Sequence, residues 1–311
     1  MTGNVTRRGV HSWRLKFESG ERDGVTGKRL TRYVTVRGTK KEAQRELIRL
    51  LAEVENGTAV DPSRVTVAEY LRGWLDGADH LANKTRERYR ALAAQQIAPH
   101  LGGIMLQKLR PANIADWHVT LLRSGGKDGR ELSARTVSHA HRLLHTALAR
   151  AAQIEIVGRN VASMVRPPKV ETEEVVILTA DQISGVLTNL AGHRLLPIVA
   201  LALGAGLRRG ELCGLRWGSV DFAAGLLRVE CAMEQTRAGL MVKEPKTRHG
   251  RRTITIPSFA IEALQAHWRQ QLEQRLALGL GRPGVGDLVF TLPMARLGVP
   301  TTSAGVGAAR R

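Results

Sequence analysis

The sequence predicts a multidomain protein that is mainly α-helical, with small β elements near its start and in its last third. Its 311 residues suffice for two or three domains and a substantial core. Apolar residues recur at helical spacing, and proline- and glycine-rich stretches interrupt them. We therefore expect domains at residues 1–60, 64–156 and 172–290, followed by an atypical tail at 291–311.

The first domain is expected to hold strands and then a helix. His11–Phe17 and Arg29–Val36 are rich in aromatic and β-branched residues, and a glycine-containing turn separates them. Thr39 and Glu42 have the spacing of a capping box and open a helix that runs to about Asn56. This pattern predicts a small sheet covered by one helix.

The second domain is expected to be a bundle of four helices with almost no strand. A second capping-box pair, Thr66 and Glu69, starts its first helix. The other helices are expected at residues 84–97, 111–123 and 133–153. Two prolines, Pro167 and Pro168, resist both helix and sheet and predict a connector to the last domain.

The composition favours a polyanionic partner. The chain has 47 Lys and Arg against 28 Asp and Glu, a formal charge of +19, and each phosphate that a cation neutralises releases counterions. A ribosomal or membrane-surface protein is the alternative. No apolar run approaches the length of a membrane span, and the first residues do not resemble a signal peptide. We expect a cytoplasmic protein with no membrane contact.

The two cysteines predict neither a disulfide framework nor a metal site. Cys213 and Cys231 are too few for such a framework and form no metal-binding pattern.

One helix of the second domain carries four cations within seven residues. Two interpretations remain open: the helix lies along a nucleic-acid backbone and forms half of a clamp, or it has an ordinary solvated face. The candidate DNA-binding residues are Lys84, Arg86, Arg88 and Arg90.

Residues 204–222, GAGLRRGELCGLRWGSVDF, are the most informative segment of the chain. Arg208 follows a glycine-rich turn at the start of a helical stretch, and a planar guanidinium binds two phosphate oxygens at once. Glu211 lies three residues further on, so it can orient the guanidinium. An exposed basic helix is the alternative. Against it, an apolar run at Leu195–Leu203, expected to be buried on all sides, precedes the segment, and core-type residues follow within it: Leu212, Leu215 and Trp217.

A second informative segment reads as a β-hairpin. Leu226–Glu230 is expected to form a strand, and Glu244–Pro257 a hairpin whose return strand alternates from Thr253 to Ile256. Lys246 lies in the loop, where a mobile lysine can reach a DNA groove. The neighbouring cations would contact phosphates whatever the role of Lys246; they are Lys243, Arg248, Arg251 and Arg252.

These two segments resemble the tyrosine recombinases, the phage-integrase family. The resemblance implies that Arg208 binds the scissile phosphate, that Glu211 supports it, and that Lys246 protonates the leaving 5′ oxygen. Lys243 and Arg248 would bind DNA beside it. In the complete enzyme a tyrosine attacks the phosphate, and the phosphotyrosine stores the bond energy, so neither metal nor nucleotide is needed.

The resemblance also implies a role for each domain. Residues 1–60 resemble an arm-type DNA-binding domain, although a generic small α+β module is the alternative. Residues 64–156 resemble a helical, SAM-like core-binding domain, and 172–290 a catalytic domain of α+β type. The implied partner is double-stranded DNA, with a homotetramer on two DNA sites where the complete enzyme forms.

The chain departs from the family after the hairpin. The second box, His-x-x-Arg followed later by Tyr, is not found; His249 and Arg252 have its spacing but lie inside the hairpin. The chain's tyrosines are Tyr33, Tyr70 and Tyr89, all before Arg208. Since the resemblance ends near residue 290, we expect a truncated or frameshifted member with an incomplete catalytic domain and no nucleophile. Whether the chain is an enzyme stays open: it is expected to bind DNA without cleaving it. The alternative is a non-catalytic regulator or decoy at recombination sites.

Overall fold

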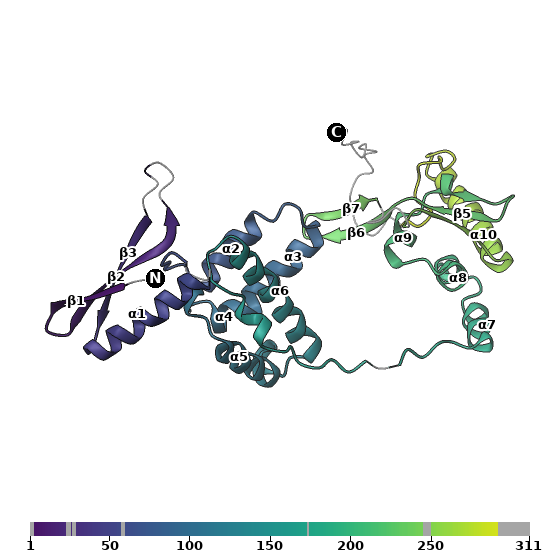
Figure 1. Cartoon of the computed structure of the whole chain (residues 1–311). Coiled ribbons are helices and arrows are strands. Elements are labelled where there is room, and N and C mark those ends of the chain that lie inside the picture. Colours follow the sequence, from purple (N-terminus) through teal and green to yellow (C-terminus); the bar gives the residue numbers. More distant parts are fainter. Residues whose placement is uncertain are drawn as a thin grey trace. The chain divides into compact units, whose positions relative to one another are not determined.

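The computed structural model describes residues 3–22, 26, 29–56, 60–172, 174–244 and 250–291. The chain divides into two compact units, Met1–Glu173 and Glu174–Arg311 (Figure 1). It is mainly helical with small antiparallel sheets, which confirms the predicted fold class. The division lies just after the predicted proline connector at Pro167 and Pro168. The predicted tail lies outside the described residues from residue 292 on.

The chain begins with a three-stranded antiparallel sheet in the order β1-β2-β3. Its elements are β1 (Gly3–Gly9), β2 (Ser12–Arg22), β3 (Arg29–Arg37) and the helix α1 (Lys40–Glu55). Leu15 and Phe17 of β2 pack against Leu47 of α1. Thr39 caps α1 through the predicted capping box with Glu42. The edge strand β1 was not predicted, because its sequence, GNVTRRG, has almost no apolar alternation.

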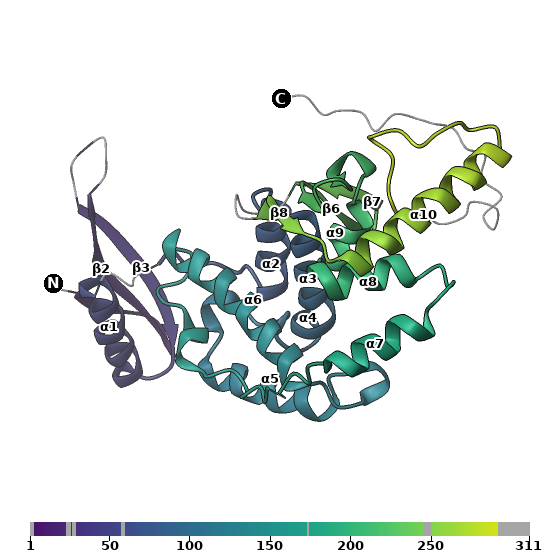
Figure 2. The same ribbon diagram turned by 90° about the vertical axis from the view of Figure 1, so that its right-hand side faces the viewer.

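A helical bundle forms the rest of the first unit. Its helices are α2 (Val67–Asp76), α3 (Asn83–Leu92), α4 (Ala98–Leu101), α5 (Pro111–Ser124) and α6 (Ala134–Gln153), with a π-helical turn at Ala93–Ile97 and short 3-10 turns at Leu106–Lys108, Lys127–Gly129 and Val161–Met164. Figure 2 shows these helices gathered together. Leu71, Ile97, Ile114 and Leu144 are part of one buried cluster. The predicted helix at 84–97 continues to residue 101 through the π turn. Pro99, which has no backbone N–H to donate, follows that turn.

Two buried histidines join α5 to α6. His118 Nε2 lies 3.1 Å from His141 Nδ1, and their side chains are 6% and 5% exposed. Burial lowers the pKa of both imidazoles, that of His141 to about 4, because the charged form loses its hydration. The two rings therefore share a hydrogen bond as neutral groups at pH 7.

The second unit combines helices with short strands. Its elements are α7 (Ala180–Asn189), α8 (Leu196–Ala205), α9 (Arg209–Gly214), a 3-10 turn at Trp217–Ser219, β4 (Val220–Asp221), β5 (Leu226–Val229), β6 (Ala232–Thr236), β7 (Gly239–Lys243), β8 (Arg252–Thr255) and α10 (Ser258–Ala277). β4, β5 and β8 form one antiparallel sheet, and β6 and β7 form a separate hairpin. Leu201, Leu212, Leu227 and Leu264 join α8, α9, β5 and α10 in one core.

The predicted return strand is β8, which pairs with the predicted strand β5, and β6 and β7 lie between them in sequence. Most of the other arm of the predicted hairpin lies outside the described residues, at 245–249. One prediction for this unit was wrong in part. The apolar run at Leu195–Leu203 does form α8. Of its side chains only Pro197, Ala200 and Leu201 are buried, so the helix has one buried face.

In the part of the chain that the structure describes, no helix is both long and apolar enough to span a bilayer. The same residues include no group of three or more His, Cys, Asp or Glu side chains placed to hold a metal ion.

The buried histidine pair predicts that acid destabilises the helical bundle. The folded-state pKa values lie below the unfolded value of about 6.5, so the unfolded chain binds more protons below that pH. The free energy of unfolding should be at its full value above pH 7 and should fall as the pH drops toward 4. The contribution of His141 to this loss is on the order of 2 kcal/mol at pH 5.

Urea unfolding followed by circular dichroism at pH 7.5 and 5.0 measures this loss. The double variant His118→Gln/His141→Gln should show a smaller difference between the two midpoints than the wild type. The exposed neighbour His139 on α6 provides a matched control, because His139→Gln should keep the wild-type difference. An unchanged pH dependence in the double variant would contradict the assignment.

Candidate active site

Arg208 is presented to solvent by the turn between α8 and α9. Gly206 ends α8 in the left-handed region, with φ +60°, a conformation that glycine adopts without strain. Leu207 then turns into the core, and Arg208 occupies the N-cap of α9 in extended backbone. Its side chain is 78% exposed.

The Glu211 carboxylate accepts two hydrogen bonds from Arg208. One carboxylate oxygen, Oε2, accepts the backbone N–H of Arg208 at 2.9 Å, and the other, Oε1, accepts from Arg208 Nη1 at 3.1 Å. The first contact is part of a capping box at the start of α9. The structure thus brings together the two residues that the sequence singled out.

Arg252 is the third member of the site, and its position was not predicted from the sequence. It begins β8 and donates Nη1 to Glu211 Oε1 at 3.0 Å and Nη2 to Oε2 at 2.8 Å. On β8 it shares a face with Ile254, and it lies opposite the buried Val229 of β5. Arg252 thus lies on the strand face whose side chains pack toward the core. An arginine at such a position indicates that a buried acidic partner neutralises it.

The Glu211 carboxylate is held in its ionised form. It is 7% exposed, and its pKa is lowered to about 2, chiefly by the hydrogen bonds from Arg252 and, after these, by those from Arg208. The same pairing raises the pKa of Arg252. Two guanidinium groups therefore face one carboxylate, and the cluster carries an excess of one positive charge.

Two glycines of α9 let a strand approach the site closely. A Cβ atom at Gly210 would lie 2.8 Å from Met233 O, and one at Gly214 would lie 3.0 Å from Met233 N. Real Cβ atoms essentially never show the first distance, and the second is tighter than most real Cβ contacts, so glycine at both positions allows β6 to pack closely on α9. The hairpin of β6 and β7 is thereby held against α9.

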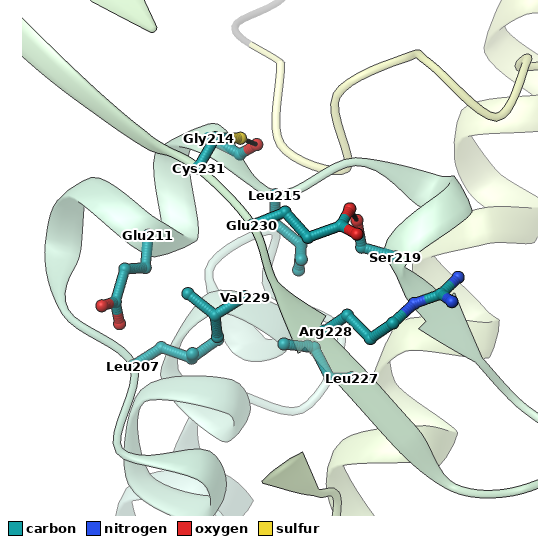
Figure 3. A pocket seen from close by; sticks show the side chains of 10 residues that line it. All are labelled: Leu207, Glu211, Gly214, Leu215, Ser219, Leu227, Arg228, Val229, Glu230 and Cys231. Carbon is teal, nitrogen blue, oxygen red and sulfur yellow. Dashed lines mark hydrogen bonds between the residues drawn. The ribbon is translucent and has the colours of Figure 1, made fainter. Parts of the chain in front are cut away.

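The cavity that described residues line next to the site is too small for a ligand larger than water. Figure 3 shows the side chains of α9, β5 and their flanking residues around a cavity of about 10 Å³, room for about one water molecule. Ser219 Oγ donates to Glu230 Oε2 at 3.0 Å, and Cys231 Sγ donates to Gly214 O at 3.1 Å across its rim. Any anion that binds Arg208 therefore binds at the surface.

The other predicted residues of this unit are only partly visible. Lys246 and Arg248 lie outside the described residues, in the gap at 245–249. Lys243 on β7 forms an ion pair with Glu234 on β6, and its side chain is 32% exposed. A phosphate would have to compete with that carboxylate for Lys243.

The four predicted cations of α3 lie on two faces of the helix. Residues four apart share a face, so Lys84 and Arg88 lie on one, and Arg86 and Arg90 on the other. Arg86 pairs with an aspartate at 3.0 Å, Arg90 with another at 2.9 Å, and Lys84 lies 3.7 Å from a glutamate; the partners are Asp79, Asp76 and Glu87. Exposed pairs of this kind contribute little and can be exchanged for phosphates. Both predicted interpretations of this helix therefore stay open.

Two segments match known protein families. Residues 66–122 match the phage integrase N-terminal SAM-like domain, and residues 176–278 match the phage integrase family. The first contains α2 to α4 and most of α5, and the second contains Arg208, Glu211 and Arg252.

Curated relatives extend the match to most of the chain. A tyrosine recombinase XerC-like protein of Caldanaerobacter subterraneus subsp. tengcongensis is 28% identical over 260 residues, which cover 78% of this chain and 65% of the relative. An integrase of Streptomyces ambofaciens is 30% identical over 250 residues, covering 78% and 62%. The chain thus spans somewhat less than two thirds of the length of these relatives.

A solved structure shares the fold. The Tn1549 transposon integrase, in complex with a circular intermediate DNA, superposes with a TM-score of 0.59 at 22% identity, over 66% of this chain and 65% of that one. Together with the two matched domains and the curated relatives, this similarity shows that the chain belongs to the phage integrase family of tyrosine recombinases.

Proposed function

We propose that this chain binds double-stranded DNA at a recombination site and that Arg208 contacts the phosphate at which strands are exchanged. The observation that carries the proposal is the exposed guanidinium of Arg208, fixed along one edge by a buried, ionised carboxylate. The net charge of +19 supports a DNA partner. So do relatives named integrases and a fold relative solved in complex with DNA.

The arrangement suits phosphodiester exchange. Negative charge grows on the non-bridging oxygens in the transition state, and fixed donors stabilise it most when they need not reorganise. The hydrogen bond to Glu211 holds the Arg208 guanidinium in place along one edge. Among the described residues, no second partner of the Arg208 guanidinium is found. Its remaining N–H groups are thus available to two phosphate oxygens. In this proposal Lys246 is the general acid for the leaving 5′ oxygen.

The tyrosines of this chain have other roles in the first unit. Tyr70 is buried and donates its hydroxyl to Ala147 O at 3.1 Å. The ring of Tyr89 stacks on Trp74, and the guanidinium of Arg14 lies over the ring of Tyr33. We infer that none of the three is the nucleophile, and that this 311-residue chain by itself binds DNA without forming a phosphotyrosine bond.

A non-catalytic regulator or decoy is the second candidate function. It is favoured by one observation, that Tyr70 and Tyr89 are engaged in packing and hydrogen bonding within the first unit. Both candidates require DNA binding, and they differ in whether a complete active site ever forms around Arg208.

The first prediction of this proposal concerns the salt dependence of DNA binding. Each phosphate contact contributes about 0.9 to the slope of log K against log salt concentration. Arg208→Gln should therefore lower the slope by about 0.9, measured by fluorescence anisotropy on a 30-base-pair duplex between 50 and 300 mM NaCl. Arg228 supplies the control: it lies on the exposed face of β5 and donates to Gly218 O, so Arg228→Gln should leave the slope unchanged. An unchanged slope in Arg208→Gln would refute the phosphate contact.

The second prediction concerns covalent chemistry. On a pool of nicked duplexes with randomised core sequences, which trap cleaved intermediates, the 311-residue chain should yield no protein–DNA adduct stable to sodium dodecyl sulfate. A relative with its own nicked site gives the positive control. An adduct would overturn the inference, and its loss in a Tyr→Phe variant at position 33, 70 or 89 would identify the nucleophile.

A further inference from the structure

The two arginines at Glu211 bind it unequally. Arg252 makes a two-bond pair in which each Nη donates to a different carboxylate oxygen, at 3.0 and 2.8 Å. Arg208 contributes only one side-chain hydrogen bond, at 3.1 Å. Their side chains are 29% and 78% exposed, respectively. Arg252 is thus committed to the carboxylate, whereas most of Arg208 faces solvent.

The sheet fixes Arg252 in this position. β8 pairs along β5, where Val229 lies opposite Arg252 and Leu227 opposite Ile254. Leu227 and Val229 are buried, so the face that carries Arg252 is the face that packs on the core. The guanidinium therefore reaches Glu211 from a rigid strand, while Arg208 reaches it from the N-cap of a short helix.

We propose that Arg252 is a positioning residue for Arg208: by occupying both oxygens of Glu211, it restricts Arg208 to a single side-chain bond and leaves the other Arg208 donors for DNA phosphate. The inference rests on the proposed role of Arg208 as a phosphate ligand. It assigns Arg252 a function that requires no contact with DNA.

The consequence of losing Arg252 follows from the hydrogen-bond geometry. Glu211 would keep its negative charge but lose two donors, and among the described residues the guanidinium that still contacts it is that of Arg208. A bidentate pair with the carboxylate is the favoured arrangement for that guanidinium. Arg208 would turn toward Glu211 and withdraw from the phosphate, and the uncompensated carboxylate would repel the DNA.

A double-mutant cycle on the full 311-residue chain tests this coupling. The duplex and salt range are those used for Arg208→Gln. Arg208→Gln and Arg252→Gln should each lower the salt slope by about 0.9, and the double variant should lose about 0.9 in total, because both changes remove the same phosphate contact. Arg228→Gln, on the opposite face of the same sheet, controls for the loss of one charge.

The outcomes separate the inference from the proposed function. A loss near 1.8 in the double variant would make Arg252 an independent phosphate contact and overturn the inference. An unchanged slope in Arg252→Gln beside a reduced one in Arg208→Gln would also overturn it and leave the proposed function intact. An unchanged slope in Arg208→Gln would refute the proposed function and the inference with it.

A measurement without DNA reports the pKa of the Glu211 carboxyl directly. Carbon-13 NMR titration of the Glu211 carboxyl, assigned by its absence in Glu211→Gln, should show that Arg252→Gln raises its pKa more than Arg208→Gln does. The opposite order would overturn the proposal.

Arg252→Lys covers the case in which Arg252→Gln fails to fold. It retains the charge but cannot bind both oxygens at once, so Arg208 should still be drawn inward and the slope should fall. A wild-type slope in this variant would also overturn the proposal.

Discussion

The second unit depends on one buried carboxylate, that of Glu211. Its oxygens accept from the backbone of Arg208, from the side chain of Arg208 and twice from Arg252. A buried ion of this kind costs several kcal/mol in lost hydration unless such donors replace the water. The contacts that compensate this cost also tie the first turn of α9 to β8. The local geometry of the candidate site therefore follows from the hydrogen bonds that the buried Glu211 carboxylate requires.

The residues around Arg208 and Glu211 position the same cluster. Gly206 permits the reversal that places Arg208 at the N-cap, and Gly210 and Gly214 permit the close approach of β6. Leu207 and Leu212 anchor the two sides of the turn in the core. Arg208 is thus held at the surface between two buried leucines, which explains how so few residues specify its position.

Local signals in the sequence predicted the helices and the pair of Arg208 and Glu211. The capping boxes at Thr39 and Thr66 are contained within four residues each, and both are present. Arg252 was interpreted as one of several surface cations, because its depth depends on the pairing of β8 with β5, across more than twenty residues of intervening chain. Pairing partners are set by tertiary contacts, which a strand's own alternation does not encode.

The positive charge of Arg252 determines whether the site can bind a phosphate. A lone Arg208–Glu211 pair would be neutral, and a bidentate geometry would consume the guanidinium edge that a phosphate needs. With Arg252 present, the carboxylate is neutralised from the sheet side, and the cluster keeps a positive excess at the surface. The pKa of Glu211, lowered to about 2, keeps that excess constant over the neutral and mildly acidic range. A pH dependence of phosphate binding near neutrality would therefore have to arise from groups other than Glu211 and its two arginines.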